Sequence, residues 1–409
     1  MIAQRSVLWV VLIGVAMSNL DQSIVGVALP TLRDAYAAEI GLIRWVVLAY
    51  QIGIIGSLLV VGRVTDLIGG RRVFLAGLVL FTSASGLCGL APTAGYLIAA
   101  RGLQGIGAAM LLTSGQALLT DAYPVERRGS AMARMHMAVA VGLTAGPSLG
   151  GLLISATGWR MIFLINLPLG LLALGLAWFR LPRSARRTVA SPWLDRSSLR
   201  SWPLAAGLLA AFLAFVALTA NMFLVPFALQ SLMGLSPARA GLVMISVPLT
   251  ILVVAPLSGR ITDRMGPRWP ATWGIGLVTV AILLLTQLRP GTGISFAVVT
   301  LVLYGVGAGL FQTPNNAAVM TAAPPGARGL VSGTLALARS LGQVAGVALA
   351  SGVWEWRQGI YVRDAGGPDP LSGALNDAFL VLAVVALITV VVCALRGAGQ
   401  PLAPEGSIS

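Results

Sequence analysis

The sequence predicts an all-α integral membrane protein with twelve transmembrane helices in two pseudo-symmetric six-helix bundles. Hydrophobic residues make up 57% of the 409 positions and charged residues only 10%, and the mean hydropathy is +0.89. A soluble domain needs far more charge on its surface. The apolar residues fall into long segments, and one charged motif occurs twice, at corresponding points of the two halves.

Each apolar segment is long enough to cross a membrane, because a hydrocarbon core about 30 Å thick needs roughly 20 helical residues. The first segment is too long for a signal peptide, contains Asp21 and lacks a small-residue cleavage site. The predicted spans are residues 7–29, 42–61, 73–91, 95–120, 131–155, 161–180, 203–228, 239–258, 270–288, 294–320, 331–355 and 374–395.

The repeated motif indicates that the two halves are related. Residues 62–72 read GRVTDLIGGRR and residues 259–268 read GRITDRMGPR. The copies follow the second and the eighth predicted spans. Two such bundles form the architecture in which transporters place a substrate site between repeats.

Polar segments between the spans predict the domain organisation. Residues 1–180 and 203–395 form the N-terminal and C-terminal bundles, residues 181–202 a linker on the inner membrane surface, and residues 396–409 a tail. All 27 basic residues are arginine. If the N-terminus is cytoplasmic, most of them face the cytoplasm, so both termini are predicted to lie inside. Residues 356–373 form the longest outer loop, where glycines and prolines favour turns.

Further motifs occur in order along the first half of the chain. They are LDQSIVGVALP at 20–30, RGLQGIGAA at 101–109, GLTAGPSLGG at 142–151 and WRMIFLINLPLG at 159–170. Together with GRVTDLIGGRR, they resemble the motifs of the major facilitator superfamily, and within it those of the drug:proton antiporters. The motifs of the first and fifth spans are similar to those of a branch whose members mostly have fourteen spans, whereas this chain has room for twelve.

The resemblance implies the major facilitator fold and proton-coupled export of hydrophobic or amphiphilic small molecules, including drugs and antibiotics, by alternating access. It implies a multi-pass protein of the inner (plasma) membrane of a bacterium. The expected partners are a small-molecule substrate, protons and membrane lipid, and the expected state is a monomer. Two other interpretations stay open. One is a lipid or metabolite transporter on the same scaffold, and the other is a non-transporting membrane sensor or scaffold in which Asp21 lacks solvent access.

Asp21 is the main candidate for proton coupling, because an ionisable group inside a span is costly and marks function. Asp21 and Arg101 stand equally far from Pro30 and Pro92, at the outer ends of their spans. Both therefore lie about 13 Å deep, which permits an ion pair. We expect proton binding to weaken this pair and bias the halves between inward-open and outward-open states. The alternatives are an Asp21 that only makes a helix contact and an Arg101 that clamps backbone carbonyls.

Glycines in the fifth span recur one helical turn apart and predict a side-chain-free stripe that another helix approaches closely. Pro147 adds a kink. By resemblance this is the antiporter motif, and its physical role is a tight seam between the halves. Ordinary small-residue packing is the alternative. The motif residues are Gly142, Gly146, Pro147, Gly150 and Gly151.

The repeated motif is predicted to form a cytoplasmic gate of charge contacts. Asp66 is expected to pair with a nearby arginine or to cap a helix end, in a turn made by Gly69 and Gly70. Pro267 replaces the second glycine in the other copy, so the first copy should be the principal gate. The predicted gate residues are Gly62, Arg63, Asp66, Gly69, Arg71, Arg72, Asp263 and Arg264.

Polar and aromatic residues within the spans predict a mixed, mostly uncharged cavity that suits amphiphilic compounds. Each polar residue can instead join helices. The candidates are Tyr50, Gln51, Gln104, Gln116, Asn221, Phe223, Tyr304, Phe311, Gln312, Asn315, Asn316 and Arg339. Arg339 would bind backbone carbonyls or attract an anionic group. Glu355 is expected to end the eleventh span at the membrane interface, beside Trp354 and Trp356.

The residue inventory argues against an enzyme. Cys88 and Cys393 lie far apart in apolar runs, and His136 is the single histidine, so the chain has no metal-ligand spacing and no Ser/His/Asp set. His136 is expected to pack rather than to relay protons. No nucleotide-binding loop follows a strand, and the arginines form no basic face for nucleic acid. We predict no catalytic residues, no cofactor and no metal.

Overall fold

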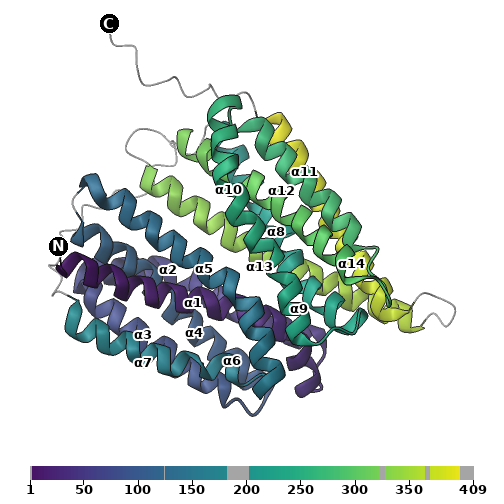
Figure 1. Ribbon diagram of the computed structural model, residues 1–409, viewed down its shortest axis with the longest axis horizontal. Coiled ribbons are helices and arrows are strands. Elements are labelled where there is room, and N and C mark those ends of the chain that lie inside the picture. Colours follow the sequence, from purple (N-terminus) through teal and green to yellow (C-terminus); the bar gives the residue numbers. More distant parts are fainter. Residues whose placement is uncertain (1, 124, 182–201, 323–327, 364–368, 397–409) are drawn as a thin grey trace, which may run out of the picture. The chain divides into compact units, whose positions relative to one another are not determined.

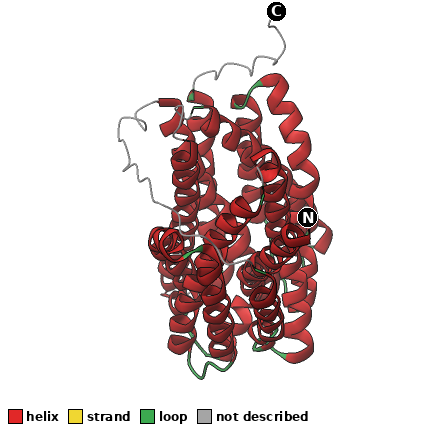
Figure 2. Cartoon of the chain, turned by 90° about the vertical axis from the view of Figure 1, so that its left-hand side faces the viewer, coloured by secondary structure: helices red, strands yellow, loops and turns green. Residues whose placement is uncertain are grey.

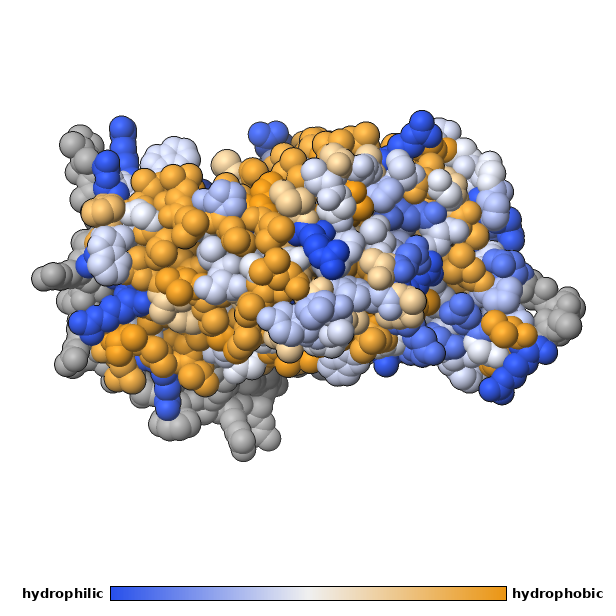
Figure 3. Space-filling view, turned by 90° about the horizontal axis from the view of Figure 1, so that it is seen from below, coloured by the Kyte–Doolittle hydropathy of each residue, from blue (hydrophilic) through white to orange (hydrophobic). Residues whose placement is uncertain are grey.

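The computed structural model describes residues 2–123, 125–181, 202–322, 328–363 and 369–396, and every regular element within them is a helix (Figure 2). In this described part, 12 helical segments are long and apolar enough to cross a membrane. Each predicted span falls on one of them. Large hydrophobic side chains are widely exposed, and hydrophobic residues form a broad area on the left of the face in Figure 3, with more polar residues on the right. The predicted all-α architecture with twelve spans is confirmed.

The helices are numbered as in Figure 1. They are α1 (Ile2–Ala35), α2 (Ile40–Ile68), α3 (Gly70–Gly89), α4 (Ala94–Ala122), α5 (Val125–Thr157), α6 (Met161–Leu164), α7 (Asn166–Arg180), α8 (Trp202–Phe227), the π-helical turn η2 (Ala228–Leu232), α9 (Pro237–Met244), α10 (Ser246–Met265), α11 (Arg268–Leu285), α12 (Ile294–Thr321), α13 (Arg328–Arg363) and α14 (Pro370–Leu395). Three spans are divided: α6 with α7, α8 with η2, and α9 with α10.

The chain divides into two compact units. The first comprises Met1–Ser191 and Leu235–Ile245, and therefore contains α1–α7 and α9. The second comprises Pro192–Gly234 and Ser246–Ser409, and contains α8, η2 and α10–α14. Although α9 belongs to the second half of the sequence, it packs against α5.

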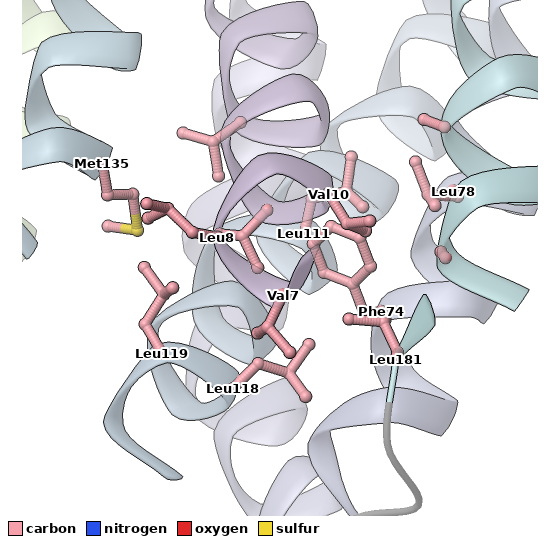
Figure 4. Packing of buried hydrophobic residues seen from close by; sticks show 14 of the residues in the cluster. Val7, Leu8, Val10, Phe74, Leu78, Leu111, Leu118, Leu119, Met135 and Leu181 are labelled. Atoms are coloured by element: carbon pink, nitrogen blue, oxygen red, sulfur yellow. The ribbon is translucent and has the colours of Figure 1, made fainter. Parts of the chain in front are cut away.

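An apolar cluster holds the first unit together around α1 and α4. Val7, Val11 and Val15 recur one turn apart on α1 and are fully or almost fully buried. They join Phe74 of α3 and Leu111 of α4, and Figure 4 shows this packing for Val7, Phe74 and Leu111. Because α1, α3 and α4 are locked together here, the polar residues further along the same helices also meet.

The glycines of α5 form the predicted side-chain-free stripe, but its partner is α1. A Cβ added at Gly142, Gly146 or Gly150 would overlap atoms of α1. Gly151 lies about 100° further round the helix and meets Pro237 of α9. The predicted seam between the halves is therefore wrong for Gly142, Gly146 and Gly150. These glycines are four positions apart and share one face of α5, and α1 of the same unit covers that face.

The second unit repeats the helix contacts of the first. Close glycine contacts fall at corresponding places: Gly105 on Tyr50, Gly107 on Phe81 and Gly142 on Ala16 in the first unit, and Gly305 on Val247, Gly307 on Val278 and Gly342 on Phe212 in the second. These contacts match α1 with α8, α2 with α10, α3 with α11, α4 with α12, and α5 with α13. The two units therefore share one backbone scaffold, as the repeated motif predicted.

The repeated charged motif is mostly helical rather than a loop. Residues 62–68 are the last turns of α2 and residues 259–265 those of α10. The turns to the next helices contain Gly69 (φ 93°) and Gly266 (φ 75°), which adopt a backbone conformation that favours glycine. The turn predicted at Gly69 is present, but most of the motif before it continues the preceding helix.

The predicted outer loop at 356–373 is partly wrong, because α13 continues to Arg363 and its helix-breaking glycines and prolines come later. Residues 364–368 lie outside the described part. Glu355 therefore does not end the helix. Trp354 is fully buried, with its ring centroid 4.7 Å from that of Phe227, rather than at a membrane interface. Trp356 is exposed.

Candidate functional site

Five polar side chains from four helices meet inside the first unit, and we call them the polar cluster. Asp21 lies on α1, Ser85 on α3, Arg101 and Gln104 on α4, and Asn166 at the start of α7. Arg101 and Gln104 share a face of α4 because they are three positions apart. Asn166 is the first residue of α7, and its amide reaches Asp21 and Ser85. None of the five is more than 1% exposed.

An ion pair between Asp21 and Arg101 forms the centre of the polar cluster. Arg101 Nη1 donates to Asp21 Oδ2 at 2.5 Å. The predicted pairing of the two residues is therefore confirmed. The guanidinium also donates to the Val46 carbonyl at 3.2 Å, and its carbon lies 4.1 Å from the centroid of the Tyr50 ring. A desolvated cation over an aromatic face is attracted by the ring quadrupole.

Two amides complete the hydrogen bonding of the Asp21 carboxylate. Gln104 Nε2 and Asn166 Nδ2 donate to Asp21 Oδ1 at 2.9 and 2.8 Å. Both amides also donate to Ser85 Oγ, at 3.0 and 2.9 Å, and this hydroxyl donates to the Phe163 carbonyl. Every partner of Asp21 in the cluster is a donor, so this arrangement satisfies the ionised carboxylate.

The polar cluster is closed to solvent in this structure. The side chain of Asp21 has an exposed fraction of 0% and that of Arg101 of 1%. A buried pair is retained at a high desolvation cost, and removing one partner leaves an uncompensated buried charge. The arrangement can therefore act as a charge switch, but a proton reaches Asp21 only when the cluster opens. The lack of solvent access is also what the sensor interpretation predicted.

Sequence reasoning missed Ser85 and Asn166 and assigned Gln104 to the substrate cavity. Asn166 belongs to the motif WRMIFLINLPLG, where it is the polar residue in an apolar stretch. That position was a usable signal. Ser85 gives a weaker signal, since serines are common within spans as interhelical contacts.

The predicted cavity residues occupy different environments. Tyr50 is buried beside the polar cluster and donates to the Ser18 carbonyl at 3.1 Å, and Gln51 is buried on the same helix. Buried within the second unit are Phe223, Tyr304, Phe311 and Asn315, whereas Gln116, Gln312, Asn316 and Arg339 retain exposed surface. The side chain of Asn221 lies outside the described residues. A common cavity stays a prediction.

Two arginines of the second unit have neutral partners in the described part of the chain. Arg339 donates to Asn316 Oδ1, and its guanidinium carbon lies 5.6 Å from the Phe215 ring centroid. Arg396, just beyond α14, donates to Asn315 Oδ1 at 2.8 Å. Burial lowers the pKa of the Arg396 guanidinium. Asn315 thus has a structural contact.

The repeated motif places one arginine in the same role in each unit. Arg71 Nη2 donates to the Trp178 carbonyl at 2.7 Å, near the end of α7, and Arg268 Nη2 donates to the Ala394 carbonyl, near the end of α14. A cation is favourable at the carbonyl end of a helix. Of the other predicted gate residues, Arg63, Arg72, Asp263 and Arg264 are exposed, Gly62 is half-buried, and the side chain of Asp66 lies outside the described residues.

Within the described ranges, no three His, Cys, Asp or Glu side chains are grouped so that they could hold a metal ion. Cys88 and Cys393 are buried free thiols. The side chain of His136 lies outside the description, so its expected packing role stays a prediction.

The duplicated helical bundle and its intramembrane ion pair define a membrane transport protein rather than an enzyme. The chain belongs to the Major Facilitator Superfamily, whose family model matches residues 11–347.

Its relatives are transporters that are named for different substrates. The chain is 28% identical to the riboflavin transporter RibZ of Clostridioides difficile (strain 630), over 84% of this chain and 87% of that protein. It is 30% identical to the multidrug resistance protein Stp of Mycobacterium tuberculosis (strain CDC 1551 / Oshkosh), over 83% and 74%. The fold is similar to that of a bacterial homologue of the human lysosomal transporter Spinster, in an inward-facing and unoccupied conformation, with a TM-score of 0.83, 16% identity and coverage of 96% and 97%.

Proposed function

We propose that this protein exports hydrophobic or amphiphilic small molecules in exchange for protons by alternating access, with Asp21 as the proton-coupling acid. The observation that carries the proposal is the Asp21–Arg101 pair, buried in a membrane-spanning bundle. Burying such a pair carries a desolvation cost of several kcal/mol, and ionisable residues inside membrane spans therefore mark functional sites. The similarity to the multidrug resistance protein Stp supports the substrate class, and the similarity to the drug efflux pump JefA of Mycobacterium tuberculosis supports the export direction.

Proton binding would act on Arg101 as well as on Asp21. Once Asp21 is neutral, its three donors lose a charged acceptor, and the described partners that Arg101 keeps, two carbonyl oxygens and the rings of Tyr50 and Phe163, are neutral. A buried guanidinium without a counterion favours a conformation in which it is hydrated. Breaking a buried pair costs about 3–5 kcal/mol. A complete shift of the population between two states needs about 5.5 kcal/mol. Loss of the pair supplies most of this free energy, and substrate binding supplies the difference.

The test is transport by the purified protein in liposomes that contain a pH-sensitive dye. Amphiphilic compounds added to one side should move protons with the wild-type protein and not with Asp21→Asn. Asp34→Asn is the matched control, because Asp34 is on the same helix but its side chain is 67% exposed and paired with Arg33 at the surface. Substrate-driven proton movement that survives Asp21→Asn would refute the assignment. Compound transport without proton movement in the wild type would refute antiport.

A second candidate is a metabolite transporter on the same scaffold, and the similarity to RibZ favours it. Arg339 is a partly buried cation whose partners in the described part of the chain, Asn316 and the Phe215 ring, are neutral, so it suits an anionic group on a metabolite. Including riboflavin and anionic amphiphiles in the liposome assay separates the two candidates. Selective loss of anion transport in Arg339→Gln supports the metabolite transporter.

We further infer that the protein works as a monomer in the inner membrane of a bacterium, with both termini in the cytoplasm. The distribution of arginines between the predicted loops supports this orientation. Labelling of single cysteines placed at each terminus in intact and in opened cells tests it.

A further inference from the structure

An apolar groove runs between α3 and α7 on the surface of the first unit. Its volume is about 480 Å³. Both walls are parts of membrane-spanning segments, and several lining side chains, among them Val79, Leu171 and Trp178, are exposed. The groove is lined by Leu75, Ala76, Val79, Leu171, Leu174, Gly175, Trp178 and Phe179.

Arginines gather at one end of this groove. The hydrogen bond from Arg71 to the Trp178 carbonyl places the start of α3 beside the end of α7. Arg72 and Arg180 therefore lie at the same end of the groove. Arg72, Ala76 and Val79 follow the i, i+4, i+7 spacing, so Arg72 continues the face of α3 that lines the groove. Arg72 and Arg180 are both exposed.

The start of α3 adds to this positive end. Its N-cap is Gly69, which has no side chain of its own to cap the first turn. The amides at a helix N-terminus favour a negative charge nearby. The groove therefore combines an apolar channel with a cationic end.

We propose that this groove binds one anionic phospholipid, with an acyl chain between α3 and α7 and the phosphate at Arg72 and Arg180. Lipid chains are as apolar as the lining residues, so the chain itself contributes little preference over bulk lipid. Selectivity comes from the headgroup, since basic pockets between transmembrane helices bind anionic headgroups. The charged end favours such a lipid over a second copy of the protein, which would need roughly 800 Å² of contact surface per partner.

The test is native mass spectrometry of the delipidated full-length protein, titrated with phosphatidylglycerol and phosphatidylcholine that carry identical acyl chains. We expect one phosphatidylglycerol to bind more than tenfold tighter than phosphatidylcholine. Arg72→Gln with Arg180→Gln should lower its affinity by roughly 25-fold, at about fivefold for each arginine. Arg264→Gln, at an exposed helix end in the second unit, should leave the affinity unchanged.

Gly175→Leu tests the groove independently of charge. A Cβ at Gly175 meets no atom within 4 Å, so a leucine fills the groove without disturbing the packing, and Gly276→Leu on α11 is the matched control because that glycine is also open. We expect Gly175→Leu to abolish the tight site and Gly276→Leu to leave it intact.

Equal affinity for the two lipids, or unchanged lipid binding in Gly175→Leu, would overturn the proposal. Two other results would do the same: a dimer of the wild-type protein that becomes monomeric in Gly175→Leu, or displacement of the lipid by a transported compound. None of these readouts depends on proton-coupled transport. The lipid site and the proposed function therefore fail separately.

Discussion

Replacing Asp21 by alanine should destabilise the first unit by about 3 kcal/mol, because it leaves the Arg101 guanidinium buried without its counterion. Removal of one partner of a buried pair costs about 3–5 kcal/mol. The lower end applies here, since Arg101 keeps the Gln104 oxygen at 2.7 Å, the Val46 carbonyl and the Tyr50 ring. For a unit of roughly 200 residues, the loss lowers Tm by about 6–12 °C.

Intrinsic fluorescence during heating in detergent measures this change. Asp34→Ala is the control, because an exposed pair contributes at most about 1 kcal/mol. The double variant Asp21→Ala with Arg101→Leu should recover part of the lost stability, since no unpaired charge then remains buried. Equal losses in Asp21→Ala and Asp34→Ala, or a double variant as unstable as the sum of the single ones, would refute the reasoning.

Three further predictions concern the surroundings of the pair and the shared scaffold. Asn166→Ala removes one hydrogen-bond donor from the Asp21 carboxylate and one from Ser85 Oγ, so it should destabilise the first unit by about 1.5–3 kcal/mol, and an unchanged Tm in detergent would contradict this. Gly146→Leu should sharply reduce the folded yield because a Cβ there overlaps α1, whereas Gly352→Leu should not, since its Cβ meets open space. Arg268→Gln should lower the free energy of unfolding by about 1.5 kcal/mol, because the Ala394 carbonyl of α14 loses its hydrogen-bond donor. An unchanged Tm would argue against a stabilising role of this hydrogen bond.

The twelve spans could be predicted because hydropathy over about 20 residues is a local property. The ends of the helices could not, as α13 illustrates. Its extension is held by Arg357, which donates to Asp377 of α14 and to Tyr361, while the Tyr361 hydroxyl donates to Asp377. These contacts join two helices, so the sequence around residue 357 alone does not reveal them.

The ion pair of the polar cluster could be predicted because the depth of a residue in the membrane can be estimated from its position in a span. The distances of Asp21 and Arg101 from nearby prolines predicted a common depth, and the structure pairs them, although α1 continues past Pro30 to Ala35. Which helix faces which is a tertiary property, so the two amide donors escaped the same reasoning. The contact of Asn166 depends on α7 lying against α1 and α3, and Gln104 could equally have faced a cavity.

The matched glycine contacts allow the polar cluster to be compared with the same places in the second unit. The matched contacts, together with the carbonyls that Arg71 and Arg268 bind, align the helices of the two units residue by residue. In this alignment Asp21 corresponds to Ala217, Ser85 to Ile282, Arg101 to Leu301, Gln104 to Tyr304 and Asn166 to Leu382. All five are buried. Four are apolar, and the Tyr304 hydroxyl donates to the Leu218 carbonyl at 2.6 Å.

The two units therefore share the same close backbone approaches, whereas the positions that correspond to the polar cluster carry no charged side chain in the second unit. Packing glycines are constrained in both units, because any side chain there would separate the helices. A second buried pair would add another desolvation cost of several kcal/mol per ion. Because the second unit offers no acid at the corresponding position, we expect proton coupling to depend on Asp21 alone at this depth. A variant with aspartate and arginine at Ala217 and Leu301 should fold poorly, since no amides there would complete the hydrogen bonding of the new carboxylate.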